Sequence, residues 1–284
     1  MQKILFLIVI NSIALCCFGQ SGMNITDKKS NPEHAHPLVV GHRGGFDSSL
    51  PENSIGLFDF TYENACSKPI GIEFDIRESA SGSLFIMHDS TVDRTTKGIG
   101  KINSLKDDYI KTLFLKDRNG NLTNGKIPMF SEVLQHFKDK NIMLMLDVKG
   151  KIYPEVIKMV VDMKMESKCI LLTFSQNNTK LVKESTGTIL ISALIVNKAG
   201  WQSILNLQIP ARQLIAYVNK ETPQEVKNEI LQNNVLVMTD ISESIYNNSK
   251  HYEPEYYKNI LAKMQLGIMI TDYPVFVNKL FCTE

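Results

Sequence analysis

The chain has 284 residues, 43% of them hydrophobic, and its 31 Lys and Arg residues nearly balance 30 Asp and Glu residues, for a formal net charge of +1. The hydrophobic content excludes a disordered or fibrous protein, and the charge balance offers no electrostatic basis for binding nucleic acid or an anionic membrane. The length fits two small domains or one large one, such as an α/β barrel of about 250 residues.

Residues 1–19 are predicted to be a signal peptide. Lys3 supplies the positive charge, residues 4–18 form an apolar run, and small residues precede the cleavage point. The run is shorter than the roughly 20 residues of a spanning helix, so no integral membrane span is expected after cleavage. Export, to a periplasm or to the medium, is the preferred interpretation. An uncleaved anchor and a lipoprotein at Cys16 or Cys17 are the alternatives, although a lipobox is poorly matched.

Residues 20–36 are polar and are expected to form a solvated linker, which leaves residues 37–284 as the folded domain. After cleavage three cysteines remain, Cys66, Cys169 and Cys282, far apart and without a CxxC pair, which argues against a cysteine zinc site. Cys66 and Cys169 are expected to be small buried residues. The sequence leaves open whether one pair forms a disulfide in an oxidising compartment.

From residue 37 onward, short apolar runs alternate with amphipathic stretches, which favours a single-domain TIM-type (β/α)8 barrel or a doubly wound parallel sheet. The barrel is the preferred prediction. The predicted strands are 38–41, 71–75, 84–88, 142–147, 170–174, 189–195, 214–218, 235–239 and 267–271. Nine strands for eight places means that one is extra, and 214–218 is the weakest candidate. Residues 91–128 are predicted to be an enlarged loop after the third strand.

The first group of polar residues that follows a predicted strand contains His42 and Arg43 between glycines. A histidine and a guanidinium beside exposed backbone N–H groups suit a phosphate oxygen. Pro51-Glu52-Asn53-Ser54 follows and has the composition of a helix start.

The second group is Glu73 and Asp75, two residues apart on one strand and therefore on one face. Two carboxylates that face the barrel interior are costly unless they share a cation. Oxygen ligands suit Mg²⁺ or Ca²⁺. An exposed, salt-bridged edge is the alternative, which the surrounding apolar residues disfavour.

The third group is His88 and Asp89, at the end of the run 84–88, and the fourth is Asp147 and Lys149. The two-residue spacing of the fourth group puts a third acid and a cation on one face. Active sites of parallel barrels are built at the carboxyl ends of the strands. The four groups are therefore expected to converge on one site at the ends of strands one to four.

Together these motifs resemble the glycerophosphodiester phosphodiesterase family. The resemblance runs in family order from residue 38 to residue 276. The matching segments are His42-Arg43-Gly44, Pro51-Glu52-Asn53-Ser54, Glu73-Phe74-Asp75, His88-Asp89 with Asp93-Arg94-Thr95-Thr96, Lys126-Ile127-Pro128, Asp147-Val148-Lys149 and residues 267–274. It implies a TIM-type barrel with one divalent cation, Ca²⁺ or Mg²⁺, that hydrolyses small-molecule glycerophosphodiesters to an alcohol and sn-glycerol 3-phosphate.

The resemblance also implies a role for each matching residue. The implied roles are metal ligands for Glu73, Asp75 and Asp147, general acid and base for His42 and His88, phosphate binding for Arg43 and Lys149, and ordering of the metal and Arg43 for the pocket residue Glu52. Which histidine is the base, and whether the nucleophile is water or the glycerol 2-hydroxyl, stays open.

Two departures from the family pattern bear on specificity. Asp147 stands where the family usually has Glu, and the strand that ends at Asp240 lacks the Trp that many members place beside the glycerol moiety. The alternatives are a phospholipase C- or D-like enzyme acting on intact lipids, for which Trp201, Tyr256 and Tyr257 are the only aromatic hints, and a non-catalytic barrel that binds phosphates or polyols.

Overall fold

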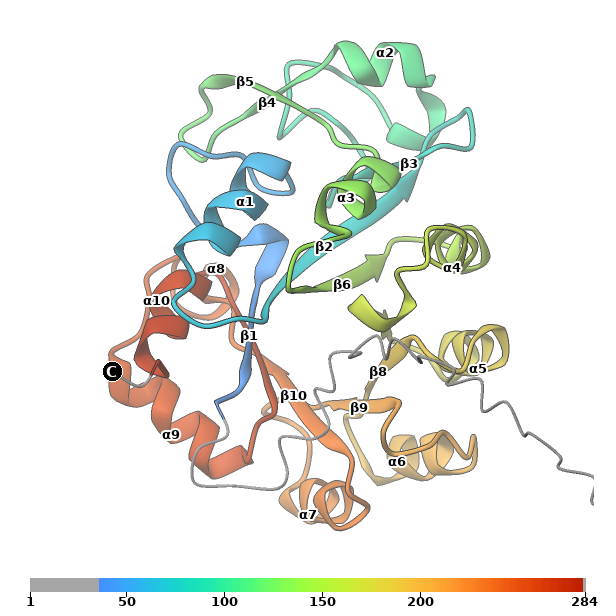
Figure 1. The fold of residues 1–284 in the computed structure, drawn as a ribbon, viewed down its shortest axis with the longest axis vertical. Coiled ribbons are helices and arrows are strands. Elements are labelled where there is room, and N and C mark those ends of the chain that lie inside the picture. The colour runs from blue at the N-terminus through green and yellow to red at the C-terminus, as the bar shows by residue number, and fades with distance from the viewer. Residues whose placement is uncertain (1–35, 283–284) are drawn as a thin grey trace, which may run out of the picture.

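A computed structural model describes residues 36–282. The predicted signal peptide and all but the last residue of the predicted linker lie outside the described residues. Within residues 36–282, eight parallel strands form a barrel, which confirms the TIM-type prediction (Figure 1). They are β1 (Leu38–Gly41), β2 (Ile70–Glu78), β6 (Ile142–Val148), β7 (Cys169–Thr173), β8 (Leu190–Leu194), β9 (Leu214–Tyr217), β10 (Leu236–Asp240) and β11 (Ile268–Thr271). β1 pairs with both β11 and β2, so the ring is closed.

Helices follow the strands and cover the outside of the barrel (Figure 1). They are α1 (Ile55–Asn64), α3 (Phe130–Phe137), α4 (Tyr153–Asp162), α5 (Gln176–Ser185), α6 (Lys198–Leu205), α7 (Gln224–Gln232), the short α8 (Glu243–Tyr246), α9 (Pro254–Met264) and α10 (Pro274–Leu280). Alternate strand residues separate two apolar layers. Ile72 and Phe74 of β2 pack outward against helices, whereas Met143 and Met145 of β6 fill the interior.

The extra strand is 84–86, not 214–218. β3 (Leu84–Ile86) runs antiparallel to the end of β2, whereas Leu214–Tyr217 forms β9, with parallel partners on both sides. The doubt about 214–218 was therefore wrong. A short apolar run has the same sequence pattern in a barrel strand and in a hairpin strand, because both are buried.

An insertion of residues 79–129 joins β2 to α3. It contains β3, η3 (Ile102–Ser104), α2 (Asp107–Thr112) and a hairpin of β4 (Phe114–Lys116) and β5 (Leu122–Lys126), and it has an apolar cluster of its own that includes Phe85, Val92 and Ile110. The predicted enlarged loop corresponds to this structured insertion. The predicted loop, residues 91–128, does follow the third strand of the chain, but that strand is part of the insertion, which connects the second strand of the barrel to α3.

A disulfide joins Cys66, just after α1, to Cys282, just after α10, with their Cα atoms 6.4 Å apart. Cys169 is a buried free thiol on β7, as predicted. The prediction of a buried Cys66 was wrong, because that residue is exposed and bridged. The disulfide ties the first helix of the barrel to the last.

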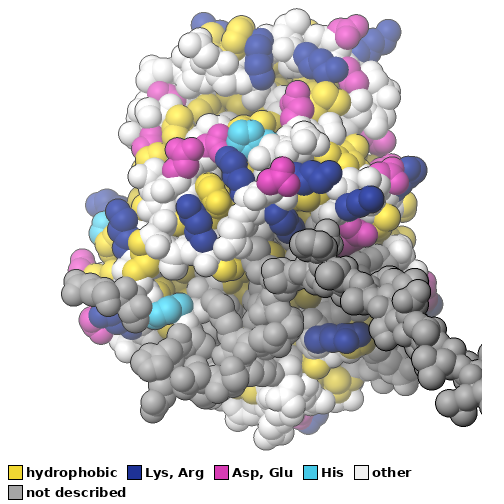
Figure 2. Space-filling view, in the orientation of Figure 1, with side chains coloured by type: hydrophobic (Ala, Val, Ile, Leu, Met, Phe, Trp, Pro, Cys, Tyr) yellow, Lys and Arg dark blue, Asp and Glu magenta, His cyan; other side chains and the backbone are white. Residues whose placement is uncertain are grey.

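In residues 36–282, no helix is both long and apolar enough to span a bilayer. On the face drawn in Figure 2, basic and acidic side chains are interspersed rather than separated into patches of one sign.

Candidate active site

A cavity of about 70 Å³ lies at the carboxyl ends of the barrel strands, the position of active sites in this architecture. Its lining residues are His42, Glu73, Asp75, His88, Asp147, Lys149, Leu172, Phe174, Tyr217, Asp240 and Ile270. Six of the eight predicted site residues are in this lining. Arg43 and Glu52, the other two, are outside the lining and are linked to it through hydrogen bonds.

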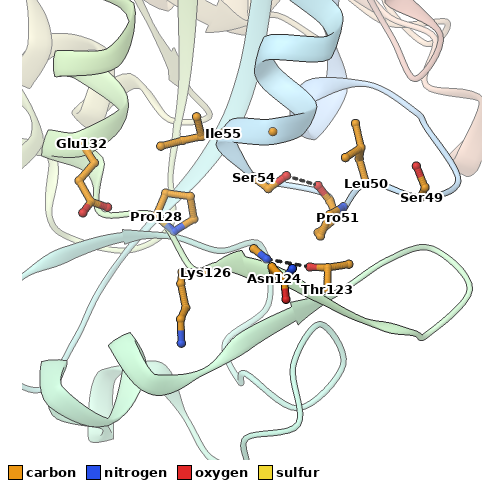
Figure 3. A pocket seen from close by; sticks show the side chains of 12 residues that line it. Ser49, Leu50, Pro51, Ser54, Ile55, Thr123, Asn124, Lys126, Pro128 and Glu132 are labelled. Atoms are coloured by element: carbon orange, nitrogen blue, oxygen red, sulfur yellow. Dashed lines mark hydrogen bonds between the residues drawn. The ribbon is translucent and has the colours of Figure 1, made fainter.

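A second hollow, of about 370 Å³, lies between the segment 49–56 and β5 (Figure 3). Its two charged residues have local structural partners: Lys126 Nζ donates to the backbone oxygen of Thr112, and Glu132 Oε2 accepts from the backbone N–H of Met129. This hollow therefore lacks the converging ionisable groups of an acid–base site, and the smaller cavity is the candidate active site.

The three predicted acids converge. β2 and β6 are neighbours, and their register places Asp75 directly opposite Asp147. Glu73, Asp75 and Asp147 are buried, and one carboxylate oxygen from each lies within 4.8 Å of the others. The two-residue spacing on β2 therefore does put both carboxylates on the interior face, while Ile72 and Phe74 pack on the outer one.

Burial and neighbouring charges both act on the carboxylates of this cluster. Burial raises the pKa of Glu73, and the neighbouring Asp75 raises it further. Burial also raises the pKa of Asp147, against the opposing charge of Lys149. Lys149 Nζ lies 3.0 Å from Asp75 Oδ1 and 2.6 Å from Asp147 Oδ2. Arg43 Nε also lies 3.8 Å from Asp75 Oδ2. The three acids supply an all-oxygen donor set, which fits Mg²⁺ or Ca²⁺.

His42 follows β1 in a short 3₁₀ turn, His42–Gly44. Its Nδ1 donates to Asp272 Oδ1 at 2.9 Å, which leaves Nε2 as the nitrogen available to a ligand. Burial disfavours the charged imidazole, but the hydrogen bond that His42 donates to Asp272 and the charges of Glu73 and Asp240 outweigh it and raise the pKa of His42 to about 9. In the metal-free chain His42 therefore carries a proton at neutral pH.

Asp272 is a site residue that the sequence argument missed. Its second oxygen, Oδ2, accepts from the backbone N–H of Ser244 at 2.6 Å, so the carboxylate is held on both sides. Its sequence signal was an acid directly after the last predicted strand, 267–271, at the end of the barrel where active sites are built.

His88 reaches the cavity by an unexpected route. It was predicted at the end of a parallel strand, but it follows the antiparallel β3, which returns the chain to the barrel rim. The backbone N–H of Met87 donates to the carbonyl of Asp75 at 2.9 Å, which anchors this return. His88 Nδ1 lies 2.8 Å from Asp89 Oδ1, so this imidazole too is oriented by a carboxylate. The two histidines converge, but from strands of opposite direction.

Glu52 binds three arginines beside the cavity. Its carboxylate accepts from Arg43 Nη1 at 3.2 Å, from Arg94 at 2.7 and 2.9 Å, and from Arg118 Nη1 at 3.5 Å. The backbone N–H of Arg43 donates to Glu73 Oε2 at 2.7 Å, which connects this cluster to the acids. Glu52 thus orders Arg43, as the resemblance implied, and it also binds Arg94 and Arg118 of the insertion.

Replacing Glu52 by Gln is expected to lower the free energy of unfolding by about 3 kcal/mol at pH 7. Burial alone would raise the pKa of Glu52, but the arginines hold it at about 2, below its ordinary value of 4.5. Because the pKa of Glu52 is lower in the folded chain than in the unfolded chain, the ionised carboxylate stabilises the fold. This stabilisation is complete above pH 4.5 and is lost as the pH falls towards 2. Urea unfolding at pH 7 and pH 3.5 measures this. A difference between wild type and variant that does not shrink at pH 3.5 would contradict the assignment.

Comparisons with known proteins bear on the family of this chain. The model of the glycerophosphoryl diester phosphodiesterase family matches residues 42–270. A glycerophosphodiester phosphodiesterase of Caldanaerobacter subterraneus is 32% identical over 154 residues, 52% of this chain and 62% of that protein. Human glycerophosphodiester phosphodiesterase 1 is 34% identical over 116 residues, 39% of this chain and 34% of that protein. The matches therefore span less than two thirds of these relatives.

Solved structures show the same architecture over most of the chain. A glycerophosphoryl diester phosphodiesterase from Parabacteroides distasonis superposes with a TM-score of 0.78 at 25% identity and covers 90% of both chains. A glycerophosphodiester phosphodiesterase from Agrobacterium tumefaciens has a TM-score of 0.66 at 18% identity, over 86% of this chain and 100% of that one. At 18% identity, the similarity to the Agrobacterium tumefaciens protein concerns the fold alone.

Proposed function

The chain belongs to the glycerophosphodiester phosphodiesterase family, and we propose that it hydrolyses glycerophosphodiesters to an alcohol and sn-glycerol 3-phosphate. The observation that carries the proposal is the convergence of two carboxylate-oriented imidazoles, three buried acids and a lysine on one small cavity. A phosphodiesterase from Oleispira antarctica with a similar fold, with a TM-score of 0.67 at 18% identity, has been solved with the product sn-glycerol-3-phosphate.

The acid cluster is the proposed metal site. Glu73, Asp75 and Asp147 would hold one divalent cation, Ca²⁺ or Mg²⁺, which polarises a phosphoryl oxygen when bound. Lys149 adds a positive charge beside the same phosphoryl group. Arg43 remains a proposed phosphate-binding residue. Its Nε is buried, lies 3.8 Å from Asp75 Oδ2 and has no hydrogen-bond partner among the described residues.

Each of the two histidines is assigned one of the two proton transfers of the hydrolysis. The P–O bond to the alcohol breaks and a new P–O bond to the nucleophile forms, so one proton is taken up and one is released. Because His42 is protonated at neutral pH, we assign it to protonate the leaving alkoxide from Nε2. His88 then accepts the proton of the nucleophile. Each such transfer is worth about 10²–10⁴ in rate.

Export is proposed as well. The N-terminal sequence predicts a signal peptide, and the Cys66–Cys282 disulfide supports an oxidising compartment, because cytosolic thiols are kept reduced.

The test is a panel of glycerophosphodiesters incubated with the purified mature chain, with and without a chelator. Release of sn-glycerol 3-phosphate is expected, with loss of activity in EDTA and recovery on addition of Ca²⁺ or Mg²⁺. Turnover of intact phosphatidylcholine without turnover of the deacylated diesters would contradict the proposal, and so would release of the phosphorylated alcohol in place of glycerol 3-phosphate.

A further inference from the structure

The loop after β10 carries a carboxylate to which the proposed reaction assigns no role. Glu243, the first residue of α8, is fully buried, and its hydrogen-bond partners among residues 36–282 are neutral. The hydroxyl of Tyr257 donates to Oε1 at 2.6 Å, the hydroxyl of Thr271 lies 2.8 and 3.0 Å from the two oxygens, and the backbone N–H of Asp272 donates to Oε2 at 2.8 Å. A buried carboxylate that lacks a cation is costly, which indicates a role beyond packing.

Glu243 and Asp272 each bind the backbone of the other's segment. Asp272 follows β11, which ends at Thr271, and its backbone N–H is donated to Glu243 rather than to a neighbouring strand. Asp272 Oδ2 in turn accepts from the backbone N–H of Ser244, the residue after Glu243, at 2.6 Å. The two bonds together fix both the position and the rotation of the Asp272 carboxylate.

The carboxylate that is fixed in this way orients His42. Asp272 Oδ1 accepts from Nδ1 of the imidazole at 2.9 Å, which leaves Nε2 for a ligand. Glu73 and Asp240 act on His42 through their charges. The direction of the ring therefore depends on Asp272, and the place of Asp272 depends on Glu243.

Glu243 is itself anchored from α9 and from its own loop. Tyr257 of α9 is fully buried, and its hydroxyl oxygen accepts from the backbone N–H of Tyr252 at 3.0 Å while its proton is donated to Glu243. The backbone oxygen of Glu243 accepts from the N–H of Asn247 at 2.8 Å. Because its side chain and its main chain are both held, Glu243 provides a rigid support for Asp272.

We propose that Glu243 is a positioning residue for the general acid of the reaction. It fixes Asp272, and through Asp272 it holds the His42 ring so that Nε2 points at the leaving oxygen. The inference rests on the proposed hydrolysis, in which His42 protonates the alkoxide. A displacement of about 1 Å at a catalytic group can lower a rate by about 10²-fold, so a residue that does not touch the substrate can still control turnover.

A purely structural role leads to a different expectation. If Glu243 only stabilises α8 and α9, its loss lowers stability and affects every substrate equally. If it positions His42, its loss is selective for substrates whose leaving group needs the proton, because a good leaving group departs without one.

The first measurement is kcat of the folded Glu243→Ala variant with two esters. With glycerophosphocholine, whose alkoxide must be protonated, kcat is expected to fall about 10–10²-fold. With the p-nitrophenyl ester of glycerol 3-phosphate, whose phenolate leaves without a proton, kcat should fall about threefold or less. Glu243→Gln keeps an oxygen that can accept from the Asp272 N–H and should recover most of the loss. Equal losses with both esters in Glu243→Ala would overturn the inference.

Gln213→Ala is the matched control. Gln213 is also buried, and its amide donates to the backbone oxygens of Thr186 and Ile189 at the amino ends of β8 and β9, the opposite end of the barrel from the cavity. Its loss should lower the melting temperature but leave the ratio of the two kcat values unchanged. If Glu243→Ala does not fold, Glu243→Asp keeps the charge but is one methylene too short to keep all three donors. It should show the same selectivity to a smaller extent, and equal losses with both esters would again overturn the inference.

A spectroscopic measurement tests the positioning without turnover. The Nδ1 proton of His42 is expected to give a downfield proton NMR signal, identified by its absence in His42→Ala. This signal should shift in Glu243→Ala and stay in place in Gln213→Ala. An unchanged signal in Glu243→Ala would overturn the inference whatever the kinetics show. A shifted signal, together with absence of glycerol 3-phosphate release by the wild type, would instead support the positioning and contradict the proposed hydrolysis.

Discussion

Alanine in place of His42 is expected to lower kcat for glycerophosphocholine by about 10²–10⁴-fold, the usual contribution of a general acid. The alkoxide of an alkyl alcohol leaves poorly at neutral pH without a proton. His42 is the histidine prepared to supply it, because Asp272 orients its ring from Nδ1 and the pKa of about 9 keeps the proton on it. Steady-state kinetics on folded variants, checked by circular dichroism, measure the loss.

The leaving group distinguishes the two histidines. A p-nitrophenyl ester of glycerol 3-phosphate releases a phenolate that needs little protonation, so the loss in His42→Ala should shrink to about tenfold or less. The loss in His88→Ala should persist with both esters, because the nucleophile must still give up its proton. His136→Ala is the matched control. His136 lies on α3 and binds Asp59 on the outside of the barrel, so its loss should not change turnover. Equal losses with both esters in His42→Ala would contradict its assignment as the acid.

Local patterns in the sequence were sufficient to predict the shared faces. Side chains two apart on a strand must point the same way, which is why Glu73 with Asp75, and Asp147 with Lys149, were correctly expected to point together into the barrel. The carboxyl ends of parallel strands share one edge, so strand order was not needed to expect these groups in one cavity.

Contacts between segments that are far apart in the sequence could not be predicted from these local patterns. The opposition of Asp75 and Asp147 depends on strand register, and the bond from His42 to Asp272 joins residues 230 positions apart. The Cys66–Cys282 disulfide spans 216 positions. His88 was placed correctly in the site for an incorrect reason: an apolar run that ends in His does not reveal whether its strand runs parallel or antiparallel.

Replacing Asp147 by Asn is expected to abolish tight binding of Ca²⁺ or Mg²⁺ and to lower kcat/KM by about 10²–10³-fold, whereas Asp147→Glu should retain both. Asn keeps the size of the side chain and can still accept a hydrogen bond from Lys149, but it removes one of the three charges that would hold the cation. Calorimetric titration with the metal salt alone measures binding independently of turnover.

Stability without metal provides the complementary measurement. Burial raises the pKa of Asp147, so its ionised form destabilises the metal-free chain at neutral pH, and this destabilisation grows as the pH rises through the raised pKa. Asp147→Asn should therefore melt no lower than wild type without metal, yet fail to gain melting temperature when Ca²⁺ or Mg²⁺ is added, because a ligand stabilises only the state that binds it. Wild type and Asp147→Glu should both gain melting temperature on addition of the metal.

A variant that melts higher on addition of metal despite lacking the Asp147 carboxylate would show that the cation lies elsewhere. Loss of all metal response in Asp147→Glu, with folding intact, would contradict the assignment of Asp147 as the third ligand.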